Sequence, residues 1–257
     1  MNSLSTEAIV LKRVDFGEAD RLVTFFTQKR GKVVALAKGV RRVTSRRAPN
    51  IEVLNRVKIF LHETRSLPIL TEAESLESFV GVKNRLEKLS LSYQLIELID
   101  RFLEEGQETR GTYDLLVNSL RALDENPVLE KCKVLVSAFK IKLLNLNGYL
   151  PELYNCALCR KELSPAGNFL SPTSGGLVGE ECRNQVLLVK SVTTQGIKTI
   201  RFLEKESMER VVKLTLVEAL VRETADLLNF YTEFFLEREL SSLNFASQIE
   251  QVLGPTN

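Results

Sequence analysis

Histidine, tryptophan and long apolar runs are scarce or missing in this chain, and each absence narrows what it can do. His62 is the single histidine and there is no tryptophan. The chain therefore has few residues for histidine-based acid–base catalysis or for extensive aromatic stacking. The sequence also lacks a G-x-x-x-x-G-K-[ST] phosphate loop, a G-x-S-x-G elbow and an H-E-x-x-H motif. Glu18 and Asp20, in the segment GEAD, are interpreted as turn residues. We therefore expect a protein that is not an enzyme.

No apolar run approaches the roughly 20 residues that a membrane-spanning helix needs. The first residues, MNSLSTEAIVLKRVDFG, alternate apolar and polar side chains and do not form the apolar core of a signal peptide. We therefore expect a cytoplasmic protein that makes no membrane contact. In that compartment the four cysteines are expected to be free, catalytic or metal-bound rather than paired in disulfides.

Acidic residues are absent between Asp20 and Glu52, although the whole chain is nearly neutral, with 35 basic and 33 acidic residues. Within this interval lies a segment, residues 29–47, that we call the basic stretch. Such a local excess of positive charge fits a polyanion as partner, and the alternative is a solvated basic loop. The basic stretch contains Lys29, Arg30, Lys32, Lys38, Arg41, Arg42, Arg46 and Arg47.

The fold class expected is α+β, with a five-stranded oligonucleotide-binding (OB) barrel at residues 1–80. Five β-rich segments with glycine and proline between them occupy about the first 80 residues, which is typical of a small barrel. The basic stretch would then cover the third strand and the loop after it. An SH3-like or protein-binding barrel with a basic loop is the alternative.

Residues 81–257 are expected to form a helical domain. Apolar residues recur at three- and four-residue steps, which predicts helices over about 82–106, 112–127, 128–148, 193–205 and 208–236. Residues 151–186 break this pattern, since they are rich in glycine, serine and proline and carry three of the four cysteines. We expect this segment to be a cysteine-containing insertion in an otherwise all-helical domain.

Cys156 and Cys159 form a C-x-x-C knuckle that could grip a tetrahedral ion, and Cys182 supplies a third thiolate. A complete structural zinc site needs a fourth ligand, but Gly179 stands where a second knuckle would place it. The alternatives are a zinc ion held by three thiolates and another ligand, and a degenerate knuckle that folds without metal. A redox knuckle is disfavoured, because the motif does not open a βαβ unit. The candidate fourth ligands are Glu180, Glu181, Cys132 and water.

The chain resembles the RecO family of bacterial DNA-repair and recombination-mediator proteins over nearly its full length. The resemblance is carried by TEAIVLKRVDFGEADRLVTFFTQKRGKVVALAKGVRR, by the following serine–arginine run, by FKIKLLNLNGYLPELYNCALC and by FLSPTSGGL. It implies an N-terminal OB barrel, a helical C-terminal domain and, in many members, a four-cysteine zinc motif. Gly179 departs from that motif.

The resemblance also implies an activity and partners. Family members bind single- and double-stranded DNA and anneal complementary strands coated with single-stranded DNA-binding protein. With RecR they help to load the strand-exchange recombinase, which implies a protein of the cytoplasm associated with the nucleoid. The alternative is a protein adaptor whose helical domain docks partners and whose basic loop is not a DNA site.

Within this family reading, the basic stretch supplies the phosphate contacts. The first candidates are Lys38, Arg41, Arg42, Arg46 and Arg47, and the secondary ones are Lys29, Arg30 and Lys32. Phe25 and Phe26 are the aromatic residues considered for base stacking. In an alternating strand one of two neighbouring residues must face the core, so at most one of them would be available.

Overall fold

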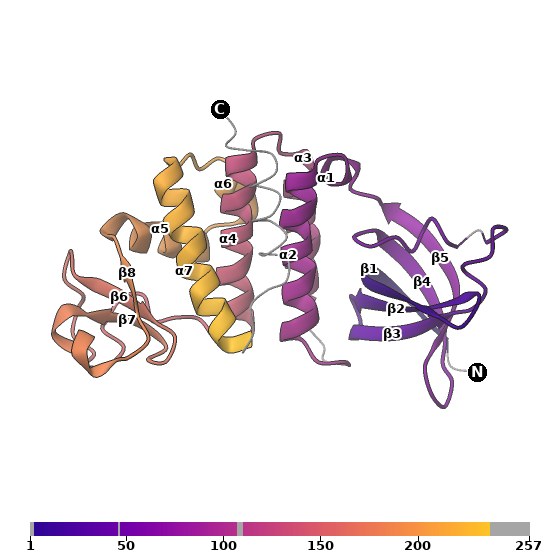
Figure 1. Ribbon diagram of the computed structural model, residues 1–257, viewed down its shortest axis with the longest axis horizontal. Helices are drawn as coiled ribbons and strands as arrows, with labels where there is room; N and C mark the ends of the chain where they lie inside the picture. The colour runs from indigo at the N-terminus through magenta and orange to yellow at the C-terminus, as the bar shows by residue number, and fades with distance from the viewer. Residues whose placement is uncertain (1–2, 46, 107–109, 237–257) are drawn as a thin grey trace. The chain divides into compact units, whose positions relative to one another are not determined.

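The computed structural model describes residues 3–45, 47–106 and 110–236. The chain divides into two compact units, Met1–Asp124 and Glu125–Asn257, which are described separately. Figure 1 shows strands in the N-terminal part and mainly helices in the remainder. The predicted α+β organisation, with a five-stranded N-terminal sheet and a helical C-terminal region, is therefore confirmed.

Five strands of the first unit close into a barrel in the order β1-β2-β3-β5-β4. A register shift between Val10 and Lys12 marks a bulge in β1, which lets this long strand pair with β2 and with β4. The barrel is completed by one parallel pair between β3 and β5, Leu36 with Ile69. The strands are β1 (Ser3–Phe16), β2 (Asp20–Thr27), β3 (Gly31–Ala37), β4 (Arg56–His62) and β5 (Ile69–Glu77).

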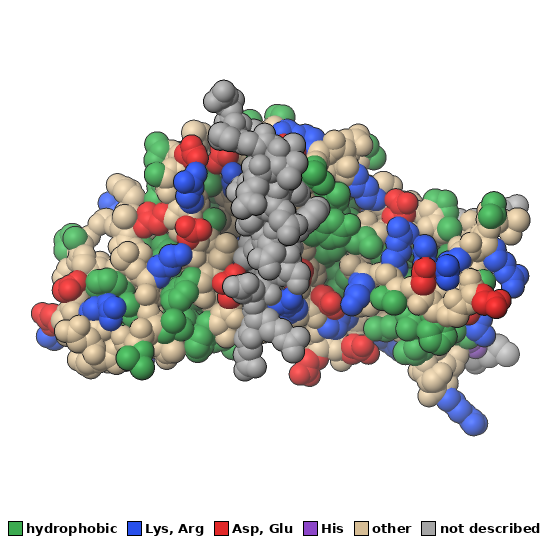
Figure 2. All heavy atoms as spheres, viewed as in Figure 1, with side chains coloured by type: hydrophobic (Ala, Val, Ile, Leu, Met, Phe, Trp, Pro, Cys, Tyr) green, Lys and Arg blue, Asp and Glu red, His purple; other side chains and the backbone are tan. Residues whose placement is uncertain are grey.

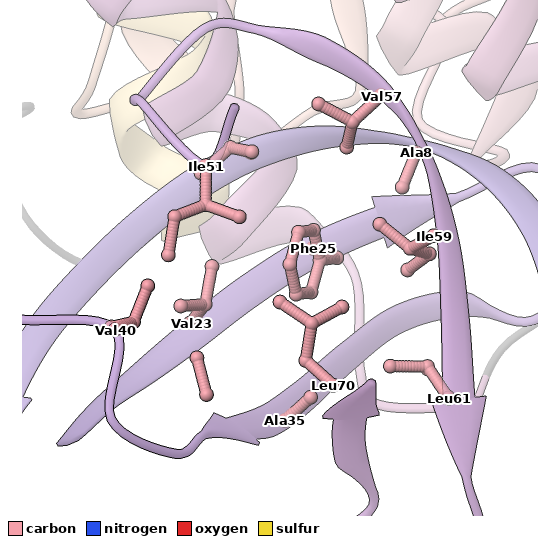
Figure 3. Close-up of a cluster of buried hydrophobic side chains, with 12 residues drawn as sticks. Ala8, Val23, Phe25, Ala35, Val40, Ile51, Val57, Ile59, Leu61 and Leu70 are labelled. Carbon is pink, nitrogen blue, oxygen red and sulfur yellow. The ribbon is translucent and has the colours of Figure 1, made fainter. Parts of the chain in front are cut away.

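The barrel interior is filled by side chains from every strand, as Figure 3 shows. Phe25 lies in the middle of this cluster and is fully buried. The inward residues alternate along the strands with outward ones, which is the two-residue period that predicted the strands. The cluster consists of Ala8, Val10, Val23, Phe25, Ala35, Ala37, Val40, Ile51, Val57, Ile59, Leu61 and Leu70.

Three helices belong to the same compact unit as the barrel: α1 (Val80–Lys83), α2 (Leu86–Phe102) and α3 (Arg110–Glu125). Phe26, on the outer face of β2, lies against Tyr113 of α3 with ring centroids 5.9 Å apart. Lys32 of β3 donates a 2.6 Å hydrogen bond to the backbone carbonyl of Asp100 in α2. One part of the outer barrel face is thus covered by helices.

An ion network fastens β4 to both of its neighbours and to α3. The Arg56 guanidinium lies 2.5 Å from a carboxylate oxygen of Glu7 and 3.1 Å from one of Glu77. Arg121 of α3 reaches the other Glu77 oxygen at 2.8 Å. Burial alone would raise the pKa of Glu77, but the hydrogen bonds from Arg121 and Arg56 outweigh it and lower that pKa. Glu77 therefore stays ionised at neutral pH as the centre of this network.

The helices of the second unit are α4 (Leu129–Leu146), α5 (Thr194–Lys205), α6 (Met208–Val211) and α7 (Glu218–Leu236). The prediction of one continuous helix over 208–236 is wrong, since residues 212–217 separate α6 from α7. That segment, VKLTLV, contains three β-branched residues, which lose side-chain freedom in a helix. The helix predicted over 82–106 is also interrupted, since α1 ends at Lys83 and α2 begins at Leu86, whereas the other predicted helices agree with the structure to within a few residues at each end.

The cysteine-containing segment is not a loop throughout, so the expectation of an all-helical domain is wrong in this respect. It contributes β6 (Asn168–Ser171), β7 (Gly176–Gly179) and the short helix η1 (Glu180–Gln185). Together with β8 (Lys190–Val192) these strands form a small sheet in the order β7-β6-β8. At Gly176 a side chain would collide with the backbone of Glu152, at 2.5 Å, so glycine permits this close approach. Among the described residues, no helix has the length and apolar character needed to cross a membrane.

Candidate functional site

The basic stretch does not form one patch, because β3 runs through its middle. Lys29 and Arg30 lie in the turn before β3, whereas Lys38 and the arginines after it follow the end of that strand. A strand of this length separates the two groups by about 20 Å. We call residues 38–55, between β3 and β4, the basic loop. Figure 2 shows lysine and arginine side chains in this part of the barrel surface.

The basic loop is docked on the turn between β1 and β2. The Gly39 amide donates to Asp20 Oδ1 at 2.7 Å, and the Arg41 amide donates to the Ala19 carbonyl at 2.9 Å. The Arg41 side chain lies 3.4 Å from Asp15, which also accepts a 2.9 Å bond from Arg21. The hydrogen bond from Arg21 and the charge of Arg41 lower the pKa of Asp15. Asp20 therefore has the turn role expected of it, as an anchor for the loop.

The Arg47 side chain links β3 and β5, the two strands whose single parallel pair closes the barrel. One guanidinium nitrogen donates to the Leu70 carbonyl at 2.6 Å and the other donates to the Lys38 carbonyl at 2.7 Å. These carbonyls belong to β5 and to the residue just after β3, so the side chain spans the single parallel pair described above. Arg47 thus fixes the start of the basic loop, and its donors already have partners in the protein.

Replacing Arg47 by alanine is expected to lower the free energy of unfolding by about 1.5–3 kcal/mol, the usual cost of losing hydrogen bonds to a charged group. Urea denaturation followed by circular dichroism would measure it. Arg42→Ala is the matched control, because that side chain is exposed and should change stability by less than about 0.5 kcal/mol. Equal stability of the two variants would contradict the anchoring role.

Among the described residues of the basic loop, Lys38 and Arg42 are the cations that remain available. Both are exposed, and within residues 3–45, 47–106 and 110–236 neither side chain has a hydrogen-bond or ion-pair partner. They border an open depression of about 500 Å³. Arg46 lies outside the described residues. The depression is lined by Asp20, Lys38, Gly39, Arg42, Thr44, Ser45 and Arg47.

The secondary candidates at the other end of β3 are engaged with the protein itself. Lys29 donates to the Ser5 carbonyl at 3.0 Å, and Arg30 forms an ion pair with Glu63. Lys32 lies 3.3 Å from a carboxylate oxygen of Asp100 in addition to its bond to the carbonyl of that residue. A phosphate would have to compete with these partners, so this group is a weaker candidate than the basic loop.

Neither aromatic residue considered for stacking is accessible: Phe25 fills the barrel core and Phe26 is covered by Tyr113. Phe26, the one of the two that faces outward, is unavailable for stacking because it lies beneath helix α3. The exposed aromatic residue of the barrel's β1–β2 hairpin is Phe16, at the end of β1, which sequence reasoning missed. The sequence indicates this residue through the two-residue spacing of Lys12, Val14 and Phe16, which places all three on one side of the strand.

In the second unit, the Sγ atoms of Cys156, Cys159 and Cys182 all lie within 4.8 Å of one another. The knuckle turn is shaped by Arg160, whose φ of 64° is left-handed and whose amide donates to the Cys156 carbonyl at 2.9 Å. The Ala157 amide donates to Leu177 of β7 at 2.7 Å. The knuckle is thereby fastened to β7, and η1 brings Cys182 to it. The predicted three-thiolate set is brought together.

The protein environment favours a thiolate at Cys156. Burial alone would raise its pKa, but hydrogen bonds from the amides of Cys159, Gly179 and Leu158 lower it to about 7. Hydrogen bonding to Cys159, together with burial, raises the pKa of Cys182 to about 11. The raised pKa of Cys182 opposes the formation of a second thiolate beside Cys156. A divalent cation would remove this opposition, because it binds thiolates and releases their protons.

The candidate fourth ligands do not join the cluster. Cys132 is buried in α4 and donates to the Asn126 carbonyl at 3.7 Å, and neither Glu180 nor Glu181 belongs to the group of close donor atoms among the described residues. Glu181 instead pairs with Lys161 at 3.2 Å. A β-carbon added at Gly179 would meet no other atom within 4 Å. The space beside Gly179 is thus open.

A closed barrel with a basic loop, in one chain with a helical region that carries a cysteine cluster, defines a class of two-part protein. The model for the recombination protein O N-terminal domain matches residues 1–79, and the model for the C-terminal domain matches residues 83–244. Together these matches cover most of the chain. The chain belongs to the RecO family.

Curated relatives agree with this assignment along almost the whole length. The chain is 34% identical over 248 residues to the DNA repair protein RecO of Roseiflexus sp. strain RS-1, covering 96% of this chain and 86% of the relative. It is 32% identical over 252 residues to that of Moorella thermoacetica, covering 97% and 93%. It is 34% identical over 245 residues to that of Desulforudis audaxviator, covering 95% and 96%.

Proposed function

We propose that this protein is a DNA repair and recombination mediator that works without catalysing a chemical reaction. It binds single- and double-stranded DNA and anneals complementary strands coated with single-stranded DNA-binding protein. With RecR it helps to load the strand-exchange recombinase. In this proposal it acts in the cytoplasm at the nucleoid, the DNA-binding domain is an OB barrel at residues 1–80, and residues 81–257 form the helical domain with its insertion at 151–186.

The observation that carries this proposal is a pair of exposed cations on the basic loop of the barrel, Lys38 and Arg42, which have no partner within the described part of the chain. Pairing of two DNA strands is slowed by repulsion between their phosphates. A protein that neutralises phosphates on each strand removes part of this barrier and releases condensed counterions. Such contacts carry no sequence information, so the bases remain free to find their register, and no nucleotide hydrolysis is required.

The cysteine cluster has a structural role in this proposal. Three thiolates within 4.8 Å of one another suit a zinc ion, with Cys156, Cys159 and Cys182 as ligands and water in the open position beside Gly179. Zinc bound there would tie the knuckle, β7 and η1 together. The ion supplies folding free energy to the insertion rather than chemistry to a reaction.

The test of the proposed function is annealing of two complementary oligonucleotides coated with single-stranded DNA-binding protein, in the absence of ATP. We expect the full-length protein to increase the rate over that of the coated strands alone, because phosphate repulsion is reduced. Quenching between dyes on the two strands measures the rate.

Lys198→Glu with Lys213→Glu is the control variant, since both side chains are exposed in the second unit. It changes the net charge as much as a double reversal in the basic loop and should anneal like the wild type. A wild-type protein that leaves the annealing rate unchanged, yet still binds protein partners, would support the adaptor alternative instead.

A further inference from the structure

The outer face of the barrel formed by β1, β2 and β3 is buried at one end and exposed at the other. Near one end Ile9 and Phe26, which are paired across β1 and β2, are fully buried. Two rows further along, Val14 pairs with Leu22 and Leu22 pairs with Leu36. Val14 is 48% exposed, and Leu22 and Leu36 are partly exposed. The helices therefore cover only one end of this face.

The uncovered end forms a continuous apolar surface, which we call the outer strip: Val14, Phe16, Leu22, Val34 and Leu36. Phe16 is 51% exposed and is paired with Asp20 in the last row of the β1–β2 hairpin. Single exposed apolar residues are ordinary on protein surfaces, whereas neighbours in strand register make a patch. Figure 2 shows hydrophobic side chains gathered over β2 and β3.

Charged residues of both signs border the outer strip at the end where Phe16 lies, and the basic loop supplies the cations. The Arg41 guanidinium donates at 3.2 Å to the carbonyl of Gly17, the residue after Phe16. Asp20, the strand partner of Phe16, also accepts the Gly39 amide of the basic loop and lines the depression with Lys38 and Arg42. An aromatic ring therefore lies beside the candidate phosphate contacts. Lys12, on the same side of β1 as Val14 and Phe16, is exposed as well.

A ligand that suits this arrangement must present apolar flat groups and negative charge side by side. An unpaired nucleic-acid strand does so, since every base has a face that can stack and every nucleotide carries a phosphate. A duplex does not, because its bases are already stacked and their faces are hidden. The exposed cations Lys12, Lys38 and Arg42 are complementary to the phosphates. Of the carboxylates near Phe16, Asp15 is paired with Arg21 and Arg41.

We propose that Phe16 is a base-stacking residue and that the outer strip is the floor of a site for single-stranded nucleic acid, with the phosphates directed to the basic loop. This inference rests on the proposed function and adds to it a means of distinguishing single strands from duplexes. Stacking is sequence-tolerant, so the site would hold bases without reading them. It assigns Phe16 a role in specificity, separate from the neutralisation of charge by Lys38 and Arg42.

The test compares Phe16→Ala, Phe16→Leu and Phe16→Trp for binding to an oligothymidylate strand and to a mixed-sequence duplex. We expect Phe16→Ala to weaken single-strand binding by roughly tenfold to a hundredfold, the effect of losing one stacked base. Phe16→Trp should restore binding and Phe16→Leu should not, because stacking needs an aromatic ring. Duplex affinity should change little in all three variants. Fluorescence anisotropy at several salt concentrations measures both.

The salt dependence separates this inference from the proposed function. Loss of stacking should lower the affinity while leaving the slope against salt concentration unchanged, since no phosphate contact is lost. Phe234→Ala, at an exposed phenylalanine of α7, is the control and should bind like the wild type. Single-strand affinity that is unchanged in Phe16→Ala, or fully kept in Phe16→Leu, would overturn the stacking role. Failure of the wild type to bind either DNA would instead overturn the proposed function.

Discussion

Reversing the charge of Lys38 and Arg42 to glutamate is expected to weaken single-stranded DNA binding by roughly sixtyfold at 50 mM salt. Each phosphate contact to a single strand contributes about 0.7 to the slope of log affinity against log salt, so loss of two contacts makes that slope shallower by about 1.4. Extrapolated to 1 M salt, the variant and the wild type should bind alike. A salt titration followed by fluorescence anisotropy measures both quantities.

The choice of these two positions follows from the contacts of their neighbours. Arg41 and Arg47 hold the basic loop on the barrel, so reversing them would disturb the loop as well as its charge. Lys198→Glu with Lys213→Glu again serves as the control of equal charge. If both double variants lose affinity equally, binding responds to net charge and not to the basic loop. If neither does, the DNA surface lies elsewhere.

Replacing Cys156 by serine is expected to reduce the zinc content from about one ion per chain to nearly none, because two thiolates do not complete a tetrahedral site. The melting temperature should fall with it, since bound metal stabilises the folded state. Elemental analysis of protein purified without added metal, together with calorimetry, would measure these changes. Cys132→Ala removes a cysteine outside the cluster and should retain the zinc.

A second substitution tests the open position directly. Gly179→Cys adds a thiol at a position where a β-carbon meets no other atom within 4 Å, and the backbone conformation there, φ −75° and ψ 163°, is ordinary for any residue. The variant should release zinc to a chelator more slowly than the wild type, because four thiolates replace three thiolates and water. Absence of zinc from the wild type, with an unchanged melting temperature in Cys156→Ser, would identify a knuckle that folds without metal.

The strands and the main helices were predictable because their signals are local. Alternation along β1 to β5 and the apolar period of α2 and α4 can be read within one segment. The break between α6 and α7 was less visible, since residues 212–217 contain enough apolar side chains to extend either helix. The short strands β6 and β7 were missed because glycine, serine and proline in the turn between them conceal two four-residue runs.

The candidate sites were predictable in composition but not in geometry. The sequence places Lys32 beside the other cations, yet its ammonium is used by Asp100, a residue far along the chain. Likewise, alternation could show that Phe26 points outward but not that Tyr113 covers it. Which cations remain available, and which aromatic residue is exposed, depends on contacts between distant segments. Only the fold supplies them.

The closure of the barrel at one parallel pair, with Arg47 across it, has a consequence for the motions of this domain. Hydrogen exchange from backbone amides reports local opening, and regions joined by few hydrogen bonds open first. Three contacts close the barrel between β3 and β5: the strand pair of Leu36 with Ile69, the hydrogen bond from the Leu36 amide to the Pro68 carbonyl, and the hydrogen bonds of the Arg47 side chain. Protection from exchange should therefore be lowest along this line. Because the basic loop begins at the same place, a strand bound to it would slow the opening of the barrel.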